Sequence, residues 1–417
     1  MFNLFKSPSL PTAEESQDQV KRALPASWYH YGPLYDLERR AIFSRRWLLV
    51  THSLRFDNTG DYVSFREAGF DFFLVKDREG NINGFHNICR HRAYPVVTEE
   101  SGSVSILSCK YHGWSYGFKG NLAKAPQFAS APGFDKAQHS LFSVHTHVDN
   151  MGFVWVNLDA NETPEVEWKS DFEGVDTQKR LNSVDLKRDF QYDHQWHMIG
   201  EYNWKTLADN YNECYHCLTG HPAVANVIDL QSYYVDTKKG YILHYNASKD
   251  PEEGTYQVAS QFCLPNASFT VTPHFFFLQR AVPISATQTR MEYEVYRRRD
   301  ASDEDFKAID AYFKTVMQED KVLCNGAQRN LSGGVFTNGQ LHPEKEKGPL
   351  WFQDKVRGLL ISHREKEEKE NEGKPIWPAT RRAAITDRLI EEERFCAALQ
   401  GAQCPGVLGE DQGILAW

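Results

Sequence analysis

The sequence contains no long apolar run, no excess of basic charge and few cysteines for its length. None of its hydrophobic stretches reaches the roughly 18 residues that a membrane-spanning helix needs. The net charge of -9 at pH 7 argues against nucleic acid or an anionic membrane as a partner. The first residues also lack the long apolar core of a signal peptide. We therefore expect a cytoplasmic protein.

Eight cysteines in a chain of 417 residues do not form the dense disulfide framework of a small secreted protein. Most of them are expected to be buried, free thiols. The chain also lacks a G-x-G-x-x-G fingerprint, a P-loop and an internal repeat. It therefore carries no nucleotide-binding or flavin-binding motif of its own, and redox chemistry in it needs electrons from a separate protein.

Hydrophobic periodicity divides the chain into four segments. Residues 1–44 end in a helical pattern, and residues 45–160 form a segment with β-like patterns such as DYVSFREAG and MGFVWVNL. Residues 161–186 are polar and acidic, which indicates a linker between domains. Residues 187–417 combine helical patterns with strands such as HFFFLQ and RMEYEVYRRR. The pattern predicts an α+β protein with a β-rich domain followed by a second, mixed domain.

Two short motifs in the β-rich segment each combine a cysteine with a histidine. Cys89 and His91 form C-x-H, and Cys109 and His112 form C-x-x-H after 17 intervening residues. A structural zinc ion accepts such a set of ligands. Two loops that each deliver one thiolate and one imidazole suit a [2Fe-2S] cluster better, with both cysteines on one iron and both histidines on the other. The imidazoles raise the reduction potential of such a cluster, which makes it a suitable electron donor for oxygen chemistry.

The sequences CRHRAYPV and CKYHGWSYGFKGNLAKAP, which contain these motifs, resemble the cluster-binding segments of Rieske non-haem iron oxygenase α subunits. The resemblance extends from LPASWYHYGPLYDLERRAIFSRRW to the region after residue 320. It implies a Rieske [2Fe-2S] domain and a catalytic domain with an antiparallel sheet and helices around a mononuclear iron. It also implies that O2 is activated at Fe(II), with electrons that come from NAD(P)H through a separate reductase or a ferredoxin.

The stretch NECYHCLTGH packs a carboxylate, two cysteines and two histidines into ten positions. Taken alone, C-x-x-C favours zinc, whereas two histidines with a carboxylate favour Fe(II). The pattern predicts a helix over residues 201–219, with Glu213 and His216 on the face away from its apolar stripe. Gly220 ends this helix, which allows His221 to turn back toward His216.

NWKTLADNYNECYHCLTGHP resembles the mononuclear-iron segment of the same oxygenases. The resemblance implies that His216 and His221 are iron ligands. Cys214 and Cys217 match no ligand position of the family, so the zinc interpretation is set aside and these two residues are expected to be core thiols.

A third, acidic ligand is expected in a helix that begins near residue 303. Asp320 falls near the centre of the apolar stripe of this helix, and Glu319 lies roughly 90° away from it. A carboxylate within an apolar stripe is costly unless a cation or a metal is its partner. In the family that the chain resembles, the third ligand is an Asp in a matching segment. Both arguments select Asp320, with Glu319 as the reserve candidate.

The resemblance gives Glu213 a separate role. In the family, this position links a cluster histidine of one subunit to an iron-ligating histidine of its neighbour. Glu213 is therefore expected to accept hydrogen bonds from His112 across the subunit boundary and from His216, and so to fix both imidazoles. The implied assembly is a homo-oligomeric ring, a trimer. Asp209, one helical turn earlier, is either a further partner of this group or a solvated acid.

Family members that dihydroxylate aromatic rings usually have Asp at this position, whereas Glu is typical of the choline, carnitine and glycine betaine monooxygenases. We therefore expect hydroxylation of a small quaternary ammonium compound. Phe275 and Phe277 lie on one face of a predicted strand and form either an aromatic cage for a cation or plain core. The alternatives are an oxygenase of aromatic acids or secondary metabolites, and a Rieske electron-transfer protein without oxygenase activity.

Overall fold

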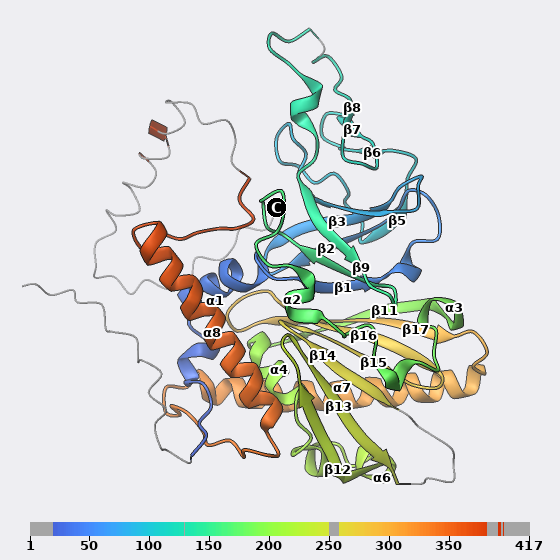
Figure 1. Ribbon diagram of the computed structural model, residues 1–417, viewed down its shortest axis with the longest axis vertical. Helices are drawn as coiled ribbons and strands as arrows, with labels where there is room; N and C mark the ends of the chain where they lie inside the picture. Colours follow the sequence, from blue (N-terminus) through green and yellow to red (C-terminus); the bar gives the residue numbers. More distant parts are fainter. Residues whose placement is uncertain (1–19, 129, 250–257, 382–390, 393–394, 396–417) are drawn as a thin grey trace, which may run out of the picture. The chain divides into compact units, whose positions relative to one another are not determined.

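Two seven-stranded antiparallel sheets dominate the part of the chain that the structure describes (Figure 1). The structure is a computed structural model, and it describes residues 20–128, 130–249, 258–381, 391–392 and 395. The described residues up to Ala379 form one unit, which contains every feature discussed below. Within the described ranges, no helix is long and apolar enough to cross a membrane.

The first sheet belongs to the β-rich domain that the sequence predicts. Its strands are β1 (Leu48–His52), β2 (Asp61–Glu67), β3 (Phe70–Lys76), β4 (Ile82–His86), β5 (Ser101–Ser103), β9 (Ser143–Val148) and β10 (Phe153–Asn157), in the order β1-β10-β9-β4-β3-β2-β5. A separate three-stranded sheet contains β6 (Leu107–Ser108), β7 (Ser115–Tyr116) and β8 (Leu122–Lys124). Short 3-10 turns cover Ser53–Arg55 and Lys136–His139.

The second sheet forms the centre of the following domain. Its strands are β11 (Phe190–Gly200), β12 (Ile228–Thr237), β13 (Tyr241–Ser248), β14 (Ala259–Cys263), β15 (Ala267–Val271), β16 (Phe275–Pro283) and β17 (Thr289–Arg298), in the order β11-β17-β16-β15-β14-β13-β12. The helices of this domain are α4 (Trp204–Tyr211), α5 (Cys217–Gly220), α6 (Val224–Val227), α7 (Asp303–Leu331) and α8 (Lys347–Glu370). The predicted α+β class, with a β-rich domain followed by a domain of antiparallel strands and helices, is confirmed.

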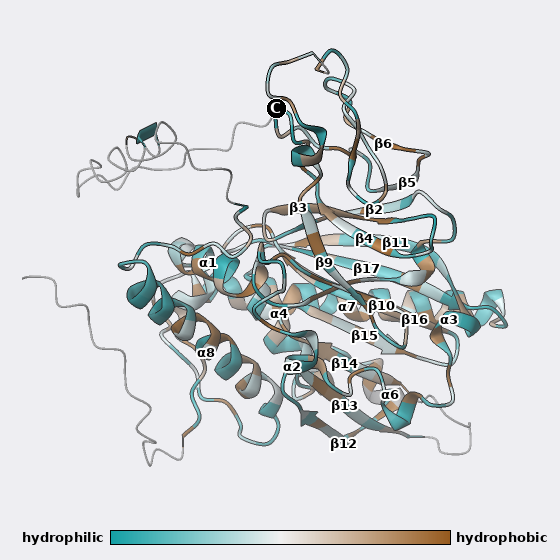
Figure 2. Cartoon of the chain, turned by 45° about the horizontal axis from the view of Figure 1, so that its top comes forward, coloured by the Kyte–Doolittle hydropathy of each residue, from teal (hydrophilic) through white to brown (hydrophobic). Residues whose placement is uncertain are grey.

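The long helix α7 begins at a capping residue and packs on the second sheet. The side chain of Ser302 accepts a hydrogen bond from the backbone N–H of Asp305, which satisfies one of the free donors of the first turn. Its apolar stripe, with Phe306, Ile309 and Met317, joins a buried cluster with residues of β16 and β17. Figure 2 shows hydrophilic and hydrophobic residues in alternation along α8. Burial of these stripes stabilises the layers by the hydrophobic effect.

Before the first sheet, the described chain forms short helical pieces. These are a 3-10 turn (Ala26–Tyr29), α1 (Gly32–Glu38) and a π-helical turn (Arg39–Phe43). In the chain, between the last strand of the first sheet and β11, lie α2 (Trp168–Phe172), a 3-10 turn (Lys179–Leu181) and α3 (Leu186–Asp189). Trp168 and Phe172 are buried in a cluster that also contains residues of both large sheets. This segment therefore connects the two domains through a shared core. Its polar composition gave no indication of this packing.

Helix α4 is held in place by a buried ion pair with α1. Lys205 Nζ bonds the carboxylate of Glu38, and both side chains are completely buried. The other oxygen of this carboxylate accepts a hydrogen bond of 2.8 Å from the indole N–H of Trp204. Burial lowers the pKa of Lys205, and the charge of Glu38 opposes this change. Because a buried pair of this kind is costly to disrupt, it fixes the helix that leads into the NECYHC segment.

Candidate metal centres

The two Cys/His motifs of the first domain form loops with the same backbone geometry. The N–H of Ala93 donates to the carbonyl of Cys89 at 3.0 Å, and the N–H of Gly113 donates to the carbonyl of Cys109 at 3.0 Å. Ala93 and Gly113 both have positive φ, 58° and 71°. Gly113 adopts this conformation without steric cost, whereas Ala93 does so against its preference. The tight turns place a buried cysteine at the start of each loop.

The side chains of these loops fit a cluster with two thiolates and two imidazoles. The rings of His91 and His112 lie 4.5 Å apart between centroids. Nδ1 of His91 is buried and has no hydrogen-bond partner among the described residues, which suits an atom that binds a metal. The hydroxyl of Tyr116 lies 3.2 Å from Sγ of Cys89, where it can donate to a thiolate. Hydrogen bonds to the sulfurs are one way in which proteins set the potential of such clusters.

The segment between α4 and α5 is a turn, so the helix predicted over residues 201–219 is interrupted. The carboxylate of Glu213 accepts hydrogen bonds from the backbone N–H groups of Tyr215 and His216. Side chains that bond nearby backbone donors compete with the regular helix, and this explains the break. The turn places His216 directly before α5 and His221 directly after it.

The structure brings His216, His221 and Asp320 together. One ligating atom from each lies within 4.8 Å of the others. Nε2 of His221 lies 3.1 Å from Nε2 of His216 and 3.0 Å from Oδ1 of Asp320, and Nε2 of His216 lies 3.5 Å from the same oxygen. Asp320 and His221 are buried. Two histidines and one carboxylate on one side of a common point are the donor set that Fe(II) binds in non-haem oxygenases.

A carboxylate orients each of these histidines from the other ring nitrogen. Nδ1 of His216 lies 2.5 Å from Oε1 of Glu213, and Nδ1 of His221 lies 2.7 Å from Oε2 of Glu319. Such partners fix the tautomer of the imidazole and leave Nε2 free for a metal. Glu319, the reserve candidate for the third ligand, thus occupies a different position, and Asp320 faces both Nε2 atoms. In the sequence, the only signal for this orienting role of Glu319 was its position directly before Asp320.

The charges at this site favour a bound cation. Burial alone would lower the pKa of His216, but hydrogen bonds to Asp320 and Glu213 raise it to about 9. Burial also tends to lower the pKa of His221, but Asp320 and Glu319 raise it above its usual value. For Asp320, the two histidines outweigh burial and lower the pKa. Without a metal, a proton on His216 offsets part of the carboxylate charge, and a divalent ion can displace this proton.

Asp209 is not part of this group of contacts. Its Oδ2 accepts a hydrogen bond of 2.6 Å from the hydroxyl of Tyr29. Burial raises the pKa of Asp209 to about 7, although the hydrogen bond from Tyr29 lowers it. Asp209 and Glu213 line a common cavity of about 290 Å³, so Asp209 is a partly buried, hydrogen-bonded neighbour of the NECYHC segment and not a fully solvated acid.

Cys214 and Cys217 form a disulfide, with Cα atoms 5.0 Å apart, so the prediction of two free core thiols is wrong. The turn that Glu213 caps brings the two cysteines together. Cys263 and Cys324 are buried and free, as predicted for most cysteines. The disulfide encloses His216 in a ring of four residues, beside the candidate iron site.

We expect Cys214 and Cys217 to resist alkylation when the protein is isolated and denatured without a reductant. Cys263 and Cys324 provide the matched control, because they should react under the same conditions. Peptide mass spectrometry before and after reduction measures both pairs. Labelling of all four cysteines in the unreduced sample would contradict the disulfide, and that outcome is typical of reducing compartments.

A cavity of about 140 Å³ opens onto the three candidate iron ligands. Phe277 and Phe313 belong to its wall, whereas Phe275 packs behind them in the core. The described lining residues are Asn210, Tyr211, Glu213, Cys214, His216, Cys217, His221, Val224, Tyr233, His244, Asn246, Ser260, Thr270, Phe277, Phe313, Val316, Met317 and Asp320. This set contains no lysine or arginine. The cavity is therefore a small site with an acidic end and an aromatic wall.

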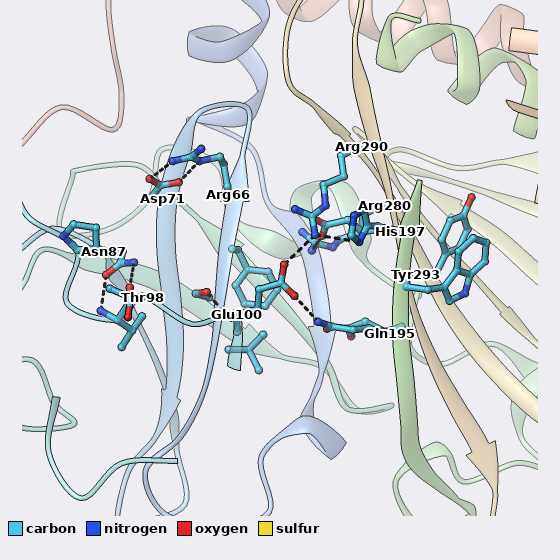
Figure 3. A pocket seen from close by; sticks show the side chains of 18 residues that line it. Arg66, Asp71, Asn87, Thr98, Glu100, Gln195, His197, Arg280, Arg290 and Tyr293 are labelled. Carbon is cyan, nitrogen blue, oxygen red and sulfur yellow. Dashed lines mark hydrogen bonds and ion pairs between the residues drawn. The ribbon is translucent and has the colours of Figure 1, made fainter. Parts of the chain in front are cut away.

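A larger cavity of about 460 Å³ lies between the two large sheets (Figure 3). Its charged side chains are paired with one another: Arg66 bonds Asp71 at 2.7 Å, and Glu100 accepts from Arg290 at 3.1 Å and from Gln195 at 2.9 Å. The contacts of Glu100, directly before β5, join the first domain to β11 and β17, whereas Arg66 and Asp71 join β2 to β3. The cavity therefore belongs to the contact between the domains, and it contains none of the candidate ligands.

Two family models match the chain. The Rieske [2Fe-2S] domain matches residues 46–138, and the ring hydroxylating alpha subunit (catalytic domain) matches residues 187–260 and 246–361. The carnitine monooxygenase oxygenase subunit of Escherichia coli (strain K12) is 28% identical over 352 residues, which cover 82% of this chain and 93% of that protein. The chloroplastic choline monooxygenase of Beta vulgaris is 27% identical over 340 residues, which cover 78% of this chain and 74% of that protein.

Solved structures share the fold. A quaternary ammonium Rieske monooxygenase in complex with an inhibitor matches with a TM-score of 0.75 and 24% identity, over 82% of this chain and 96% of that one. Naphthalene 1,2-dioxygenase from Rhodococcus sp. matches with a TM-score of 0.66 and 20% identity, over 82% and 94%. The two matched domains, in this order, define an oxidoreductase with a Rieske cluster, a mononuclear iron and an external electron donor. The chain belongs to the Rieske non-haem iron oxygenases, as an α subunit.

Proposed function

We propose that this oxygenase oxidises a small quaternary ammonium compound with O2 and two electrons from a separate reductase or ferredoxin. The observation that carries the proposal is the cavity at the three candidate iron ligands. Its acidic end and aromatic wall, with no basic side chain among the described lining residues, suit a compact organic cation. The names of the matched relatives, carnitine and choline monooxygenases, point to the same class of substrate.

The cluster in this proposal is held by Cys89, His91, Cys109 and His112. Their support is the matching geometry of the two loops and the unpartnered Nδ1 of His91. The loops lie in the first of two proposed functional domains, residues 45–160, after an N-terminal segment of residues 1–44. Bound there, the cluster supplies electrons one at a time.

The iron in this proposal is held by His216, His221 and Asp320, in the catalytic domain that we assign to residues 187–417, after the connecting segment 161–186. Bound there, it supplies activation of O2. Glu213 and Glu319 keep the two imidazoles oriented from their Nδ1 atoms. The apolar wall of the cavity limits water next to the reacting carbon, and the acidic groups stabilise the positive charge of the substrate.

The proposal includes a homo-oligomeric ring, with three subunits, in which electrons cross between neighbours. Within one chain, the cluster loops lie beside β6 and β7, at the opposite end of Figure 1 from α4 and α7. His112 is exposed on its loop, so it is accessible to the Glu213 of a neighbouring subunit. A related quaternary ammonium Rieske monooxygenase has been described in terms of inter-subunit electron transfer. We place the complex in the cytoplasm, because its reductase uses NAD(P)H.

Oxygen uptake coupled to a reductase tests this function. We expect uptake, with formation of an aldehyde, when choline, carnitine or glycine betaine is the substrate. Benzoate and other aromatic acids are the comparison set and should give only background consumption. Tetramethylammonium should inhibit competitively, because it presents the same cation without the oxygen-bearing tail of these substrates. Uptake with aromatic acids alone would leave the oxygenase in place and overturn the ammonium substrate.

A further inference from the structure

The hydroxyl of Tyr211 is a buried donor in the cavity, and no described residue forms a hydrogen bond with it. Burial raises the pKa of Tyr211, and the nearby hydroxyls of Thr270, Ser268 and Ser260 oppose this change. Ser260 and Thr270 are already bonded to each other at 2.9 Å. A buried hydroxyl without a partner is costly, so this donor is suited to an acceptor on a bound molecule.

The hydroxyl of Tyr233, the other tyrosine that lines this cavity, by contrast already donates a hydrogen bond. The amide nitrogen of Asn212 donates to the carbonyl of Ala208 at 2.8 Å, which directs Oδ1 of Asn212 toward Nε2 of His244, 3.3 Å away. Nε2 must therefore carry the proton of this imidazole, and Nδ1 accepts the hydroxyl proton of Tyr233 at 2.9 Å. Burial lowers the pKa of His244 to about 3, so the ring is neutral. Of the two tyrosines among the described lining residues of this cavity, Tyr211 is the one whose hydroxyl has no hydrogen-bond partner.

Tyr211 and the candidate iron ligands line the same cavity, and different elements surround them. The hydroxyls around Tyr211 belong to β14 and β15, whereas the ligating atoms come from the turn around α5 and from Asp320 of α7. The aromatic side chains of Phe277 and Phe313 contribute to the wall. A substrate with a cation at one end and an oxygen at the other therefore finds a complementary surface for each end.

Resting on the function proposed above, we propose that the Tyr211 hydroxyl donates a hydrogen bond to an oxygen on the tail of the substrate. This contact directs an N-methyl group, and not the tail, toward the metal. The acceptor is an alcohol in choline and a carboxylate in glycine betaine, and both offer the same hydrogen-bonding chemistry. Tyr211 is then a residue that positions the substrate and selects the carbon that is oxidised.

This orientation leads to N-demethylation. The trimethylammonium group, O2, two electrons from the reductase and two protons give an N-hydroxymethyl group and water. The bond between nitrogen and the hydroxymethyl carbon then breaks. This step releases formaldehyde and a proton and leaves a tertiary amine with two N-methyl groups and the tail. Oxidation of the tail would instead give an aldehyde that retains all three N-methyl groups.

The test compares binding of three ligands to the intact enzyme with both metal centres, under anaerobic conditions. Calorimetry measures choline, glycine betaine and tetramethylammonium with the wild type and with Tyr211→Phe. We expect the substitution to weaken binding of the oxygen-bearing substrate about tenfold, the contribution of one hydrogen bond, and to leave tetramethylammonium unchanged. Tyr241→Phe is the matched control, because the Tyr241 hydroxyl bonds the backbone of Glu173 outside this cavity.

Each outcome has a defined meaning. Selective loss for choline or for glycine betaine supports the proposal and identifies the acceptor as an alcohol or a carboxylate. Unchanged affinity for both, or an equal loss for tetramethylammonium, overturns it. Products of aerobic turnover provide a second readout: formaldehyde is expected, and betaine aldehyde or trimethylamine would overturn the orientation. If no ammonium compound binds and aromatic acids are oxidised, the proposed function itself falls.

Discussion

Asp320→Ala should remove the mononuclear iron and lower substrate oxidation more than about a hundredfold, while the adjacent substitution Glu319→Ala should leave the iron in place. Asp320 Oδ1 faces Nε2 of both histidines, so its loss removes one of three ligands. Glu319 contacts only Nδ1 of His221, and loss of such an orienting partner typically costs about 10–100-fold in affinity or activity. Iron content should fall from about three to about two atoms per chain for Asp320→Ala only.

The two variants control for each other, because they remove neighbouring acids from one helix. The visible and electron paramagnetic resonance spectra of the cluster should be the same in both, which shows that the first domain has folded. Equal loss of iron from the two variants would mean that Glu319 is also a ligand. Full retention of iron and activity in Asp320→Ala would remove this site from the proposal altogether.

Much of the fold follows from local patterns in the sequence. Before residue 160, the strands are short runs rich in apolar residues, of which β1 and β10 are buried along their whole length, and the apolar stripe of α7 recurs at helical spacing. The segment over residues 161–186 was harder to interpret, because its few apolar residues, Trp168 and Phe172 among them, pack in a core that both sheets build. A short, mainly polar sequence does not indicate which distant residues it packs against. Only the structure therefore showed that this segment is a packed connection.

The site residues could be predicted from the sequence where a motif and its spacing agree. They could not be predicted where the geometry depends on distant elements. His216, His221 and Asp320 could be chosen from a family resemblance and a helical stripe. The predicted continuous helix failed because the Glu213 carboxylate competes for backbone donors, which no periodicity records. Tyr211 matched the apolar stripe of that helix, so its free hydroxyl could be recognised only from the neighbours that β14 and β15 supply.

Glu213→Gln should slow electron transfer to the iron about a hundredfold while both metal centres stay loaded. The carboxylate contacts Nδ1 of His216 at 2.5 Å and also accepts the backbone N–H groups of the turn. Glutamine has nearly the same shape and keeps an acceptor oxygen, so the turn is retained. It lacks the negative charge that stabilises the imidazole and cannot take up a proton with the transferred electron. The expected result is a defect in rate, with metal content and substrate binding close to wild type.

Single-turnover absorbance of the reduced cluster, mixed with substrate and O2, measures this rate directly. Glu201→Gln is the matched control, since Glu201 is an exposed acid shortly before α4 and should transfer electrons at the wild-type rate. If Glu213→Gln reoxidises its cluster as fast as wild type, the carboxylate only shapes the turn, and electrons reach the iron by another route. If the variant loses iron as well, Glu213 acts through the orientation of His216 alone. Slow reoxidation with full metal content is the outcome that a bridging carboxylate requires, because only that role separates electron delivery from metal binding.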